Sequence, residues 1–198
     1  DNTYQLEVTA TDREGLRVTR PLLVQVTNNT GDDGIALSTR VWLQGPYNQQ
    51  TQLMDNTLQL KDLLPVKQPY AAQPFAYNGS EVRSSAVDSA TAGDALVDWV
   101  LIDIRTNANT IVASKAALLQ RDGDVVDAQS GSNWLSFANV PTGNYYVSLR
   151  HRNHLGVITA SPLNLTQTAK LVDFTSTDTV VAGKETRLTN GKSAWLWA

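Results

Sequence analysis

Apolar and polar residues alternate with a period of two through most of the chain. In residues 134–159, WLSFANVPTGNYYVSLRHRNHLGVIT, the residues Tyr145, Val147 and Leu149 share one side of such a pattern. This period, carried by aromatic and β-branched residues, is typical of half-buried antiparallel strands. We therefore predict a strand, a tight Pro-Thr-Gly turn, a long neighbouring strand, a polar His-Arg-Asn-His tip and a return strand.

Residues 95–105, ALVDWVLIDIR, are the best candidate for a central strand. Apolar residues occur on both of its faces, with Trp99 and Leu101 on one and Val100, Ile102 and Ile104 on the other. Strands that are apolar on both faces are usually covered on both sides. We expect this strand to lie in the middle of the structure, between two layers.

Turn signals separate the remaining strands. Asp122-Gly123 predicts a hairpin, because Asp-Gly readily adopts the positive φ angles of a tight turn, and Asn190-Gly191 predicts another near the C-terminus. Residues 47–80 are longer and less regular than an ordinary connection. We expect the aromatic residues of this segment to pack over the sheet.

The N-terminal segment has its own alternating pattern. Residues 4–27 predict two strands around a turn, which we assign to a separate unit of residues 1–30. A linker at 31–35 follows, then a main sandwich at 36–175 and a C-terminal hairpin at 176–198 that leads toward a following segment.

These patterns together predict an all-β chain, an antiparallel β-sandwich with an extra N-terminal β-hairpin. A hairpin of two strands is marginally stable in water when it stands alone. We therefore expect the N-terminal strands to dock on the following domain or to be completed by another chain. The expected partners are neighbouring domains of the same polypeptide or identical chains.

The composition of the chain excludes some classes of partner and favours one class of protein. The chain has 198 residues, 18% charged residues, a net charge of −3 and no cysteine. A nucleic-acid partner would require a clustered cationic surface, and the sequence has no basic block. No apolar run approaches the roughly 20 residues of a membrane span. An export product without disulfides is typical of a bacterial surface protein rather than of a small animal ectodomain.

One motif in the N-terminal hairpin carries a family resemblance. The stretch VTATDREGL at residues 8–16, followed by LLVQVT, resembles the last two strands of bacterial cadherin-like repeats. The resemblance implies calcium binding at Asp12, although the acidic linker that completes such sites is replaced here by Asn28-Asn29-Thr30. Calcium requires about 6–8 oxygen ligands. The alternative, a turn with a solvated aspartate, explains Asp12 without a metal.

A second resemblance covers residues 36–198. The stretches LLQRDGDVVD, VPTGNYY and RHRNHLGVIT are similar to a region near the C-terminus of large secreted surface proteins of Gram-negative bacteria. The turn around Val140, Gly143 and Tyr145 is also similar to transthyretin-like and Cna-B sandwiches. These resemblances imply an immunoglobulin- or transthyretin-like sandwich, secreted or on the cell surface, that has no enzymatic activity.

Few residues of the sequence suggest a catalytic or metal-binding site. His151 and His154 are the only histidines, and a zinc or catalytic site built on them would need a third ligand that the sequence does not single out. We favour a structural role, in which the imidazoles and the neighbouring arginines hold the hairpin tip by hydrogen bonds. Acidic residues at 122, 124 and 127 resemble part of a calcium loop, but Asp-Gly turn chemistry accounts for them without a metal.

The aromatic residues support one sharper hypothesis. We consider a sugar-stacking platform made of five residues, Trp42, Tyr47, Tyr70, Phe75 and Tyr77. Amphipathic Tyr and Trp suit such a wet surface, whereas core packing is the competing explanation for the same residues. The leading function is thus a structural or adhesion module, and the alternative is a carbohydrate-binding module that recognises surface polysaccharide. A hydrolase using His151 or His154 is a third and weaker hypothesis.

Overall fold

The structure is a computed structural model that describes residues 2–26, 34–183 and 186–198, with the side chains of residues 7–19 in the first range. The chain divides into two units, Asp1–Asp32 and Asp33–Ala198. Most of the linker expected at 31–35 lies outside the described residues, and Ile35 already begins a strand.

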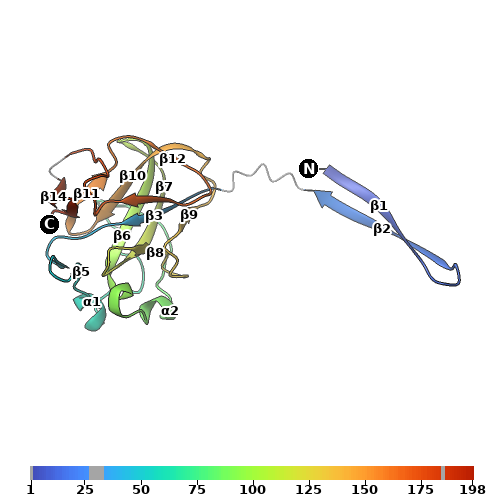
Figure 1. Cartoon of the computed structure of the whole chain (residues 1–198), viewed down its shortest axis with the longest axis horizontal. Coiled ribbons are helices and arrows are strands. Elements are labelled where there is room, and N and C mark those ends of the chain that lie inside the picture. Colours follow the sequence, from blue (N-terminus) through green and yellow to red (C-terminus); the bar gives the residue numbers. More distant parts are fainter. Residues whose placement is uncertain (1, 27–33, 184–185) are drawn as a thin grey trace. The chain divides into compact units, whose positions relative to one another are not determined.

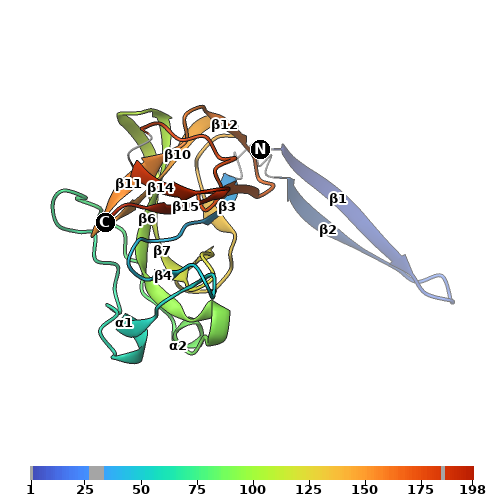
Figure 2. The ribbon, with the colours of Figure 1, turned by 60° about the vertical axis from the view of Figure 1, so that its left-hand side comes forward.

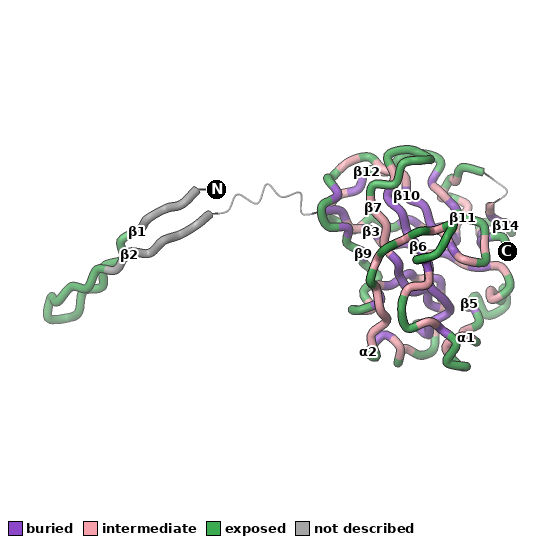
Figure 3. The backbone as a smooth tube through the Cα atoms, turned by 180° about the vertical axis from the view of Figure 1, so that it is seen from behind, coloured by how far each residue is buried: buried purple, intermediate pink, exposed green. Residues whose placement is uncertain are grey.

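The first unit is the predicted N-terminal hairpin. Strands β1 (Asn2–Thr11) and β2 (Arg17–Val26) pair antiparallel over their whole length, with Thr9 opposite Thr19. The turn between them contains Gly15 at a φ of +89°. All side chains described here, residues 7–19, are exposed to solvent (Figure 3). This ribbon therefore has no core of its own within the described residues.

The second unit is built around an antiparallel sheet of six strands (Figure 1). Its order is β11-β10-β6-β7-β8, and β12 pairs with β10 beyond the end of β11. The strands are β6 (Leu96–Asn107), β7 (Thr110–Gln120), β8 (Val125–Val126), β10 (Gly143–His151), β11 (His154–Ile158) and β12 (Leu163–Leu165). The predicted central strand thus lies in the middle of this sheet, between β7 and β10.

Strand β6 is buried on both faces, as its sequence predicts. Val100, Ile102 and Ile104 belong to one hydrophobic cluster, and Trp99 and Leu101 belong to the other. An irregularity between Leu96 and Asp98 sets two residues of β6 against one of β7, which is a β-bulge and shifts Val97 into the first cluster.

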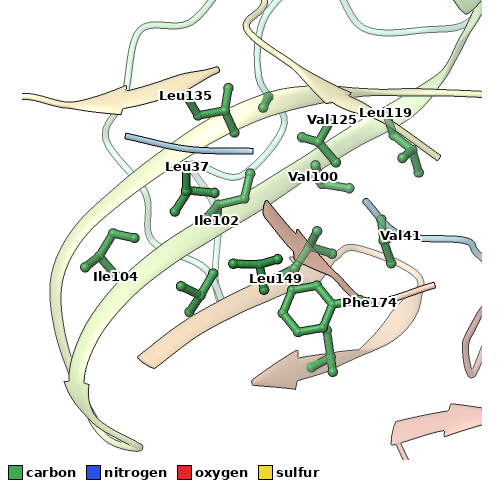
Figure 4. Close-up of a cluster of buried hydrophobic side chains, with 14 of the residues drawn as sticks. Leu37, Val41, Val100, Ile102, Ile104, Leu119, Val125, Leu135, Leu149 and Phe174 are labelled. Atoms are coloured by element: carbon green, nitrogen blue, oxygen red, sulfur yellow. The ribbon is translucent and has the colours of Figure 1, made fainter. Parts of the chain in front are cut away.

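A smaller sheet covers the first cluster. It has the order β13-β3-β9 and consists of β3 (Ile35–Arg40), β9 (Leu135–Phe137) and β13 (Lys170–Asp173). Leu37 and Leu135 are opposite one another in its register and belong to the same cluster as Ile102 of β6, which lies next to Leu37 (Figure 4). The two stacked sheets make the chain an all-β sandwich, in which β13 and β3 pair parallel and β3 and β9 pair antiparallel.

The second cluster is covered by the irregular segment between residues 55 and 95. It contains two single-turn helices, α1 (Thr57–Leu60) and α2 (Ser85–Asp88), which lie together at one end of the sandwich (Figure 2). The amide of Gln59 joins them by donating to the carbonyl of Asp88 at 2.8 Å. Within the described ranges, no helix is long and apolar enough to cross a membrane.

The C-terminal residues belong to the same unit as the sandwich. Strands β14 (Arg187–Asn190) and β15 (Ser193–Leu196) form the hairpin that Asn190-Gly191 predicts. Leu196 is fully buried, and its N–H donates to the carbonyl of Trp42 at 2.8 Å. A short pair, β4 (Tyr47–Asn48) and β5 (Leu53–Met54), precedes α1 and was not predicted.

The expectation that residues 134–149 form two neighbouring strands is wrong. Strand β9 pairs with β3 in the small sheet, whereas β10 pairs with β6 in the large sheet. The turn at 138–142 therefore carries the chain from one sheet to the other. The period of two is the same for a hairpin and for such a crossover, so the alternation could not distinguish them.

A close contact at the β7–β8 turn can be tested with matched glycine variants. At Gly123 the φ is +94°, and an added Cβ would lie 2.8 Å from Nε1 of Trp42. We expect Gly123→Ala to lower the free energy of unfolding by about 2–3 kcal/mol, from strain and overlap together. Gly191→Ala shares a positive φ of +61° but meets nothing within 4 Å, so only about 1 kcal/mol should be lost. Equal losses in chemical denaturation would contradict the packing of Trp42 on this turn.

Candidate functional site

Two buried aspartates of the central strand β6 are at the centre of the candidate site. Asp98 is 4% exposed and Asp103 is fully buried, although both lie in a strand covered on its two faces. A buried carboxylate is costly unless it is paired and hydrogen-bonded. The partners of these two residues therefore decide how the site is built.

Asp103 is held by a network that crosses three strands. The guanidinium of Arg150 donates to both carboxylate oxygens at 2.9 Å, and Arg105 donates at 2.8 Å. The hydroxyls of Ser114 and Ser148 donate at 2.7 and 3.0 Å. Burial alone would raise the pKa of Asp103, but the hydrogen bonds from Arg150, Ser114 and Arg105 hold that pKa below its usual value. Asp103 is therefore an ionised clamp between β6, β7 and β10.

Asp98 is held by the tip of the β10–β11 hairpin. Arg152 donates to its two oxygens at 2.7 and 2.9 Å, and Nε2 of His151 lies 3.2 Å from Oδ2. Burial would raise the pKa of Asp98, but the hydrogen bond and charge of His151, followed by the charge of Arg152, keep this pKa low. The carboxylate is thus ionised and fixes both partners.

The two histidines converge at this tip, although they are three positions apart. Their Nδ1 atoms are 2.8 Å apart, and Nε2 of His154 lies 2.9 Å from the carbonyl oxygen of Gln44. The chain of contacts runs from Asp98 through His151 and His154 to Gln44. It ties the hairpin tip to the segment that follows β3.

The acceptors at both ends of this chain fix which nitrogen of each imidazole donates. Since the Asp98 carboxylate and the Gln44 carbonyl only accept, Nε2 of each histidine carries a hydrogen. Nδ1 of His151 also accepts from the N–H of Asn153 at 3.2 Å, so both nitrogens of this ring have partners within the tip.

A cleft of about 380 Å³ lies beside this chain and is lined by Asp98, His151 and His154 together with apolar residues such as Leu43 and Val97. A general base needs a free nitrogen or carboxylate oxygen within reach of a substrate proton. The ring nitrogens here already bond within the protein. The arrangement therefore holds the hairpin tip, as the favoured structural hypothesis for His151 and His154 expects.

Asp98, which organises this site, was not among the candidate residues predicted from the sequence. Asp98 was visible as a charge inside an apolar strand, but 53 positions separate it from His151. A carboxylate at such a position signals a buried partner without identifying it. Asp103 likewise binds Arg150 directly, although 47 positions separate the two residues.

The candidate calcium residues serve turns. Oδ1 of Asp12 accepts from the N–H groups of Glu14 and Leu16, at 2.9 and 2.8 Å. Asp122 accepts from its own loop, whereas Asp124 pairs with Arg40. Asp127 pairs with Lys115 and accepts from Gln129 and Ser130, interactions that lower its pKa to about 2 against the effect of burial. Over the described ranges, no group of three or more acidic or histidine side chains could hold a metal ion.

The five aromatic residues of the proposed sugar platform fall into two groups instead of one row. Trp42 and Tyr47 stack at 4.2 Å between ring centroids, and Trp195 joins them at 5.6 Å from Tyr47. These rings are half-buried, and Trp42 and Tyr47 pack on the first hydrophobic cluster.

The second group packs on the other face of the large sheet. Tyr70 is fully buried, donates to the carbonyl of Trp99 at 2.6 Å and contacts Phe75 edge-on. The hydroxyl of Tyr77 bonds to Glu81, and burial raises the pKa of both tyrosines. Tyr70 therefore has no free face for a sugar, and the expectation that these aromatics pack over the sheet is confirmed for it.

Comparison with known proteins adds no relative: no family model, no curated protein and no solved structure matches this chain.

The Asp103 network predicts a large and specific loss of stability. In Asp103→Asn the guanidinium groups of Arg150 and Arg105 lose their buried counter-ion, so we expect the free energy of unfolding to fall by about 3 kcal/mol. Asp124→Asn is the matched control, because this carboxylate pairs with Arg40 near solvent and its pKa is raised by burial and by Asp122. The control should cost under about 1 kcal/mol. If urea denaturation gave similar losses of unfolding free energy for both variants, Asp103 would not hold the three strands together as described.

The histidine pair predicts a pH dependence. Burial, together with the charge of His151, lowers the pKa of His154 below 6.5 despite its bond to Gln44. The unfolded state then binds this proton more tightly, so stability is full above pH 6.5 and falls as the pH drops through the folded pKa. We expect the free energy of unfolding to decline from pH 6.5 to 5, and less steeply in His154→Gln. If the free energy of unfolding of the wild type did not change with pH, or if His154→Gln had the same slope, the role of the histidine pair would be contradicted.

Proposed function

We propose that this chain is a non-enzymatic, extracellular structural and adhesion module of a large bacterial surface protein. In this proposal the N-terminal hairpin completes a neighbouring domain, and the sandwich holds that domain and the following segment apart. The single observation that carries the proposal is the contrast between the two units, since one is a ribbon and the other has a complete core.

The ribbon has the properties of a part that belongs to a larger sheet. Its strands are ten residues each, which is long for a hairpin without a third strand. Apolar side chains on it are open to water, with Val8 53%, Val18 52% and Leu16 69% exposed. Two unpaired edges and an apolar face favour the addition of further strands. The cadherin-like VTATDREGL motif, which spans the turn, supports a neighbour of that class.

The sandwich has the properties of a rigid spacer. Its central strand is covered on both faces, and two ionised carboxylates lock that strand to β10 and to the hairpin tip. The hydroxyl- and amide-rich surface and the cysteine-free composition support a bacterial extracellular setting. The internally satisfied Asp98–His151–His154 chain supports a structural rather than a catalytic role.

Hydrogen exchange tests the assignment of the hairpin. In this chain alone we expect the amides of β1 and β2 to exchange quickly, because a two-stranded ribbon opens easily, while those of β6 and β7 stay protected. The same β1 and β2 amides should become protected in a longer polypeptide that includes the preceding residues of the parent protein. The readout is exchange followed by mass spectrometry of peptides from both units.

The same measurement separates this proposal from docking of the hairpin on its own sandwich. Docking would protect β1 and β2 in the chain alone, and a deletion of residues 1–32 would then lower the melting temperature of the sandwich. Either result would overturn the assignment to a neighbouring domain.

A further inference from the structure

Trp134 is exposed in a way that the fold does not require. Its relative exposure is 66%, against 45% for Trp197, and the other three tryptophans are buried or half-buried. Its backbone N–H donates to Ser132, and no ring contact involves its indole within the described ranges. An indole left in water forgoes roughly 2 kcal/mol or more of burial. This side chain therefore serves something other than the core.

The register of the small sheet gives Trp134 two neighbours on the outer face. Leu37 pairs with Leu135, and Trp134 is the residue that directly precedes β9. The same register continued by one residue places Trp134 beside Ser38 of β3. From the other side, Leu171 of β13 pairs with Ser38 and is itself 56% exposed. The small Ser38 thus lies between two large exposed side chains. We refer to Trp134, Ser38 and Leu171 as the Trp134 face.

A polar cleft of about 320 Å³ adjoins this face. Its lining includes Arg40, Asp122, Asp124 and Asn133, and it shares Ser38 and Leu171 with the Trp134 face. Arg40 is held in place, because it pairs with Asp124 at 2.7 Å and donates to the carbonyl of Asp122 at 2.6 Å. The cleft therefore presents a guanidinium, carboxylates, an amide and a hydroxyl in a fixed arrangement next to an exposed indole.

We propose that the Trp134 face and its cleft bind a neutral polysaccharide. The indole stacks on the C–H face of a pyranose ring, and the polar groups of the cleft bond to the ring hydroxyls. A polysaccharide fits because a planar aromatic surface and paired donors and acceptors occur side by side, as in sites with an apolar wall and few orienting polar groups. The inference concerns the sandwich alone and goes beyond the structural role proposed above.

The composition of the face argues against the other ligand classes. A protein partner needs about 800 Å² of complementary surface with an apolar centre, whereas only Trp134 and Leu171 are large and apolar here. An acidic polysaccharide or nucleic acid would meet two carboxylates against the one guanidinium of Arg40. A neutral chain of hexoses or pentoses has neither problem.

Affinity electrophoresis of the full chain tests the proposal, in gels that contain soluble neutral polysaccharides (xyloglucan, xylan, mixed-linkage glucan, laminarin, galactomannan) or alginate as the acidic comparison. We expect retardation by at least one neutral polysaccharide and none by alginate. Trp134→Ala should weaken that binding about tenfold or more, which corresponds to a loss of about 1.4 kcal/mol. Asn133→Ala should weaken it severalfold.

Trp197→Ala is the matched control, because Trp197 is also exposed but directly follows β15, where its carbonyl accepts from the N–H of Leu155 in β11 of the large sheet. Binding should persist in this variant, and the melting temperature of Trp134→Ala should equal that of the wild type. Absence of binding to every neutral polysaccharide overturns the proposal, as does an equal loss in both tryptophan variants. A dimer in light scattering that Trp134→Ala abolishes would assign the face to self-association instead and would also overturn it.

Discussion

Two ionised carboxylates inside a strand that is covered on both faces are the constraint on which the sandwich depends. Asp98 and Asp103 lie where an unpaired charge would be strongly unfavourable, so β6 requires cations at fixed positions along it. Arg105 of β6 itself pairs with Asp103, and residues 150–152 supply the other partners. Arg150 reaches Asp103, while Arg152 and the imidazole of His151 reach Asp98. A slip of β10 by one residue would turn its side chains to opposite faces and separate these charges. The ion pairs therefore help to specify the register of the large sheet.

The same constraint explains why the polar hairpin tip is not a free site. His151 and His154 lie at the edge of a cleft, and their residue types alone would suit catalysis or metal binding. Their hydrogens, however, are committed to a chain that ends on an ionised carboxylate and a backbone carbonyl. Such a fully satisfied buried network rigidifies its surroundings. The rigid frame it creates leaves the outer faces and edges of the sandwich as the places for recognition.

The functions proposed above assign a separate task to each unit of the chain. The hairpin of the first unit exposes apolar residues and unpaired edges, which suit the addition of strands from a neighbour. The sandwich exposes one tryptophan beside a polar cleft on its smaller sheet. The proposed adhesion module would join neighbours through one unit and present the proposed polysaccharide-binding face on the other.

The sequence by itself determined most of the strands, most of the turns and the burial of β6 on both faces, because alternation and Asp-Gly or Asn-Gly turn chemistry act over a few residues. Only the tertiary structure decided that β9 and β10 belong to different sheets, that Asp98 meets His151, and that Tyr70 is buried while Trp134 is exposed. These outcomes depend on which distant segments pack together. A period of two gives each strand two faces, but the layers laid over it decide which face meets water.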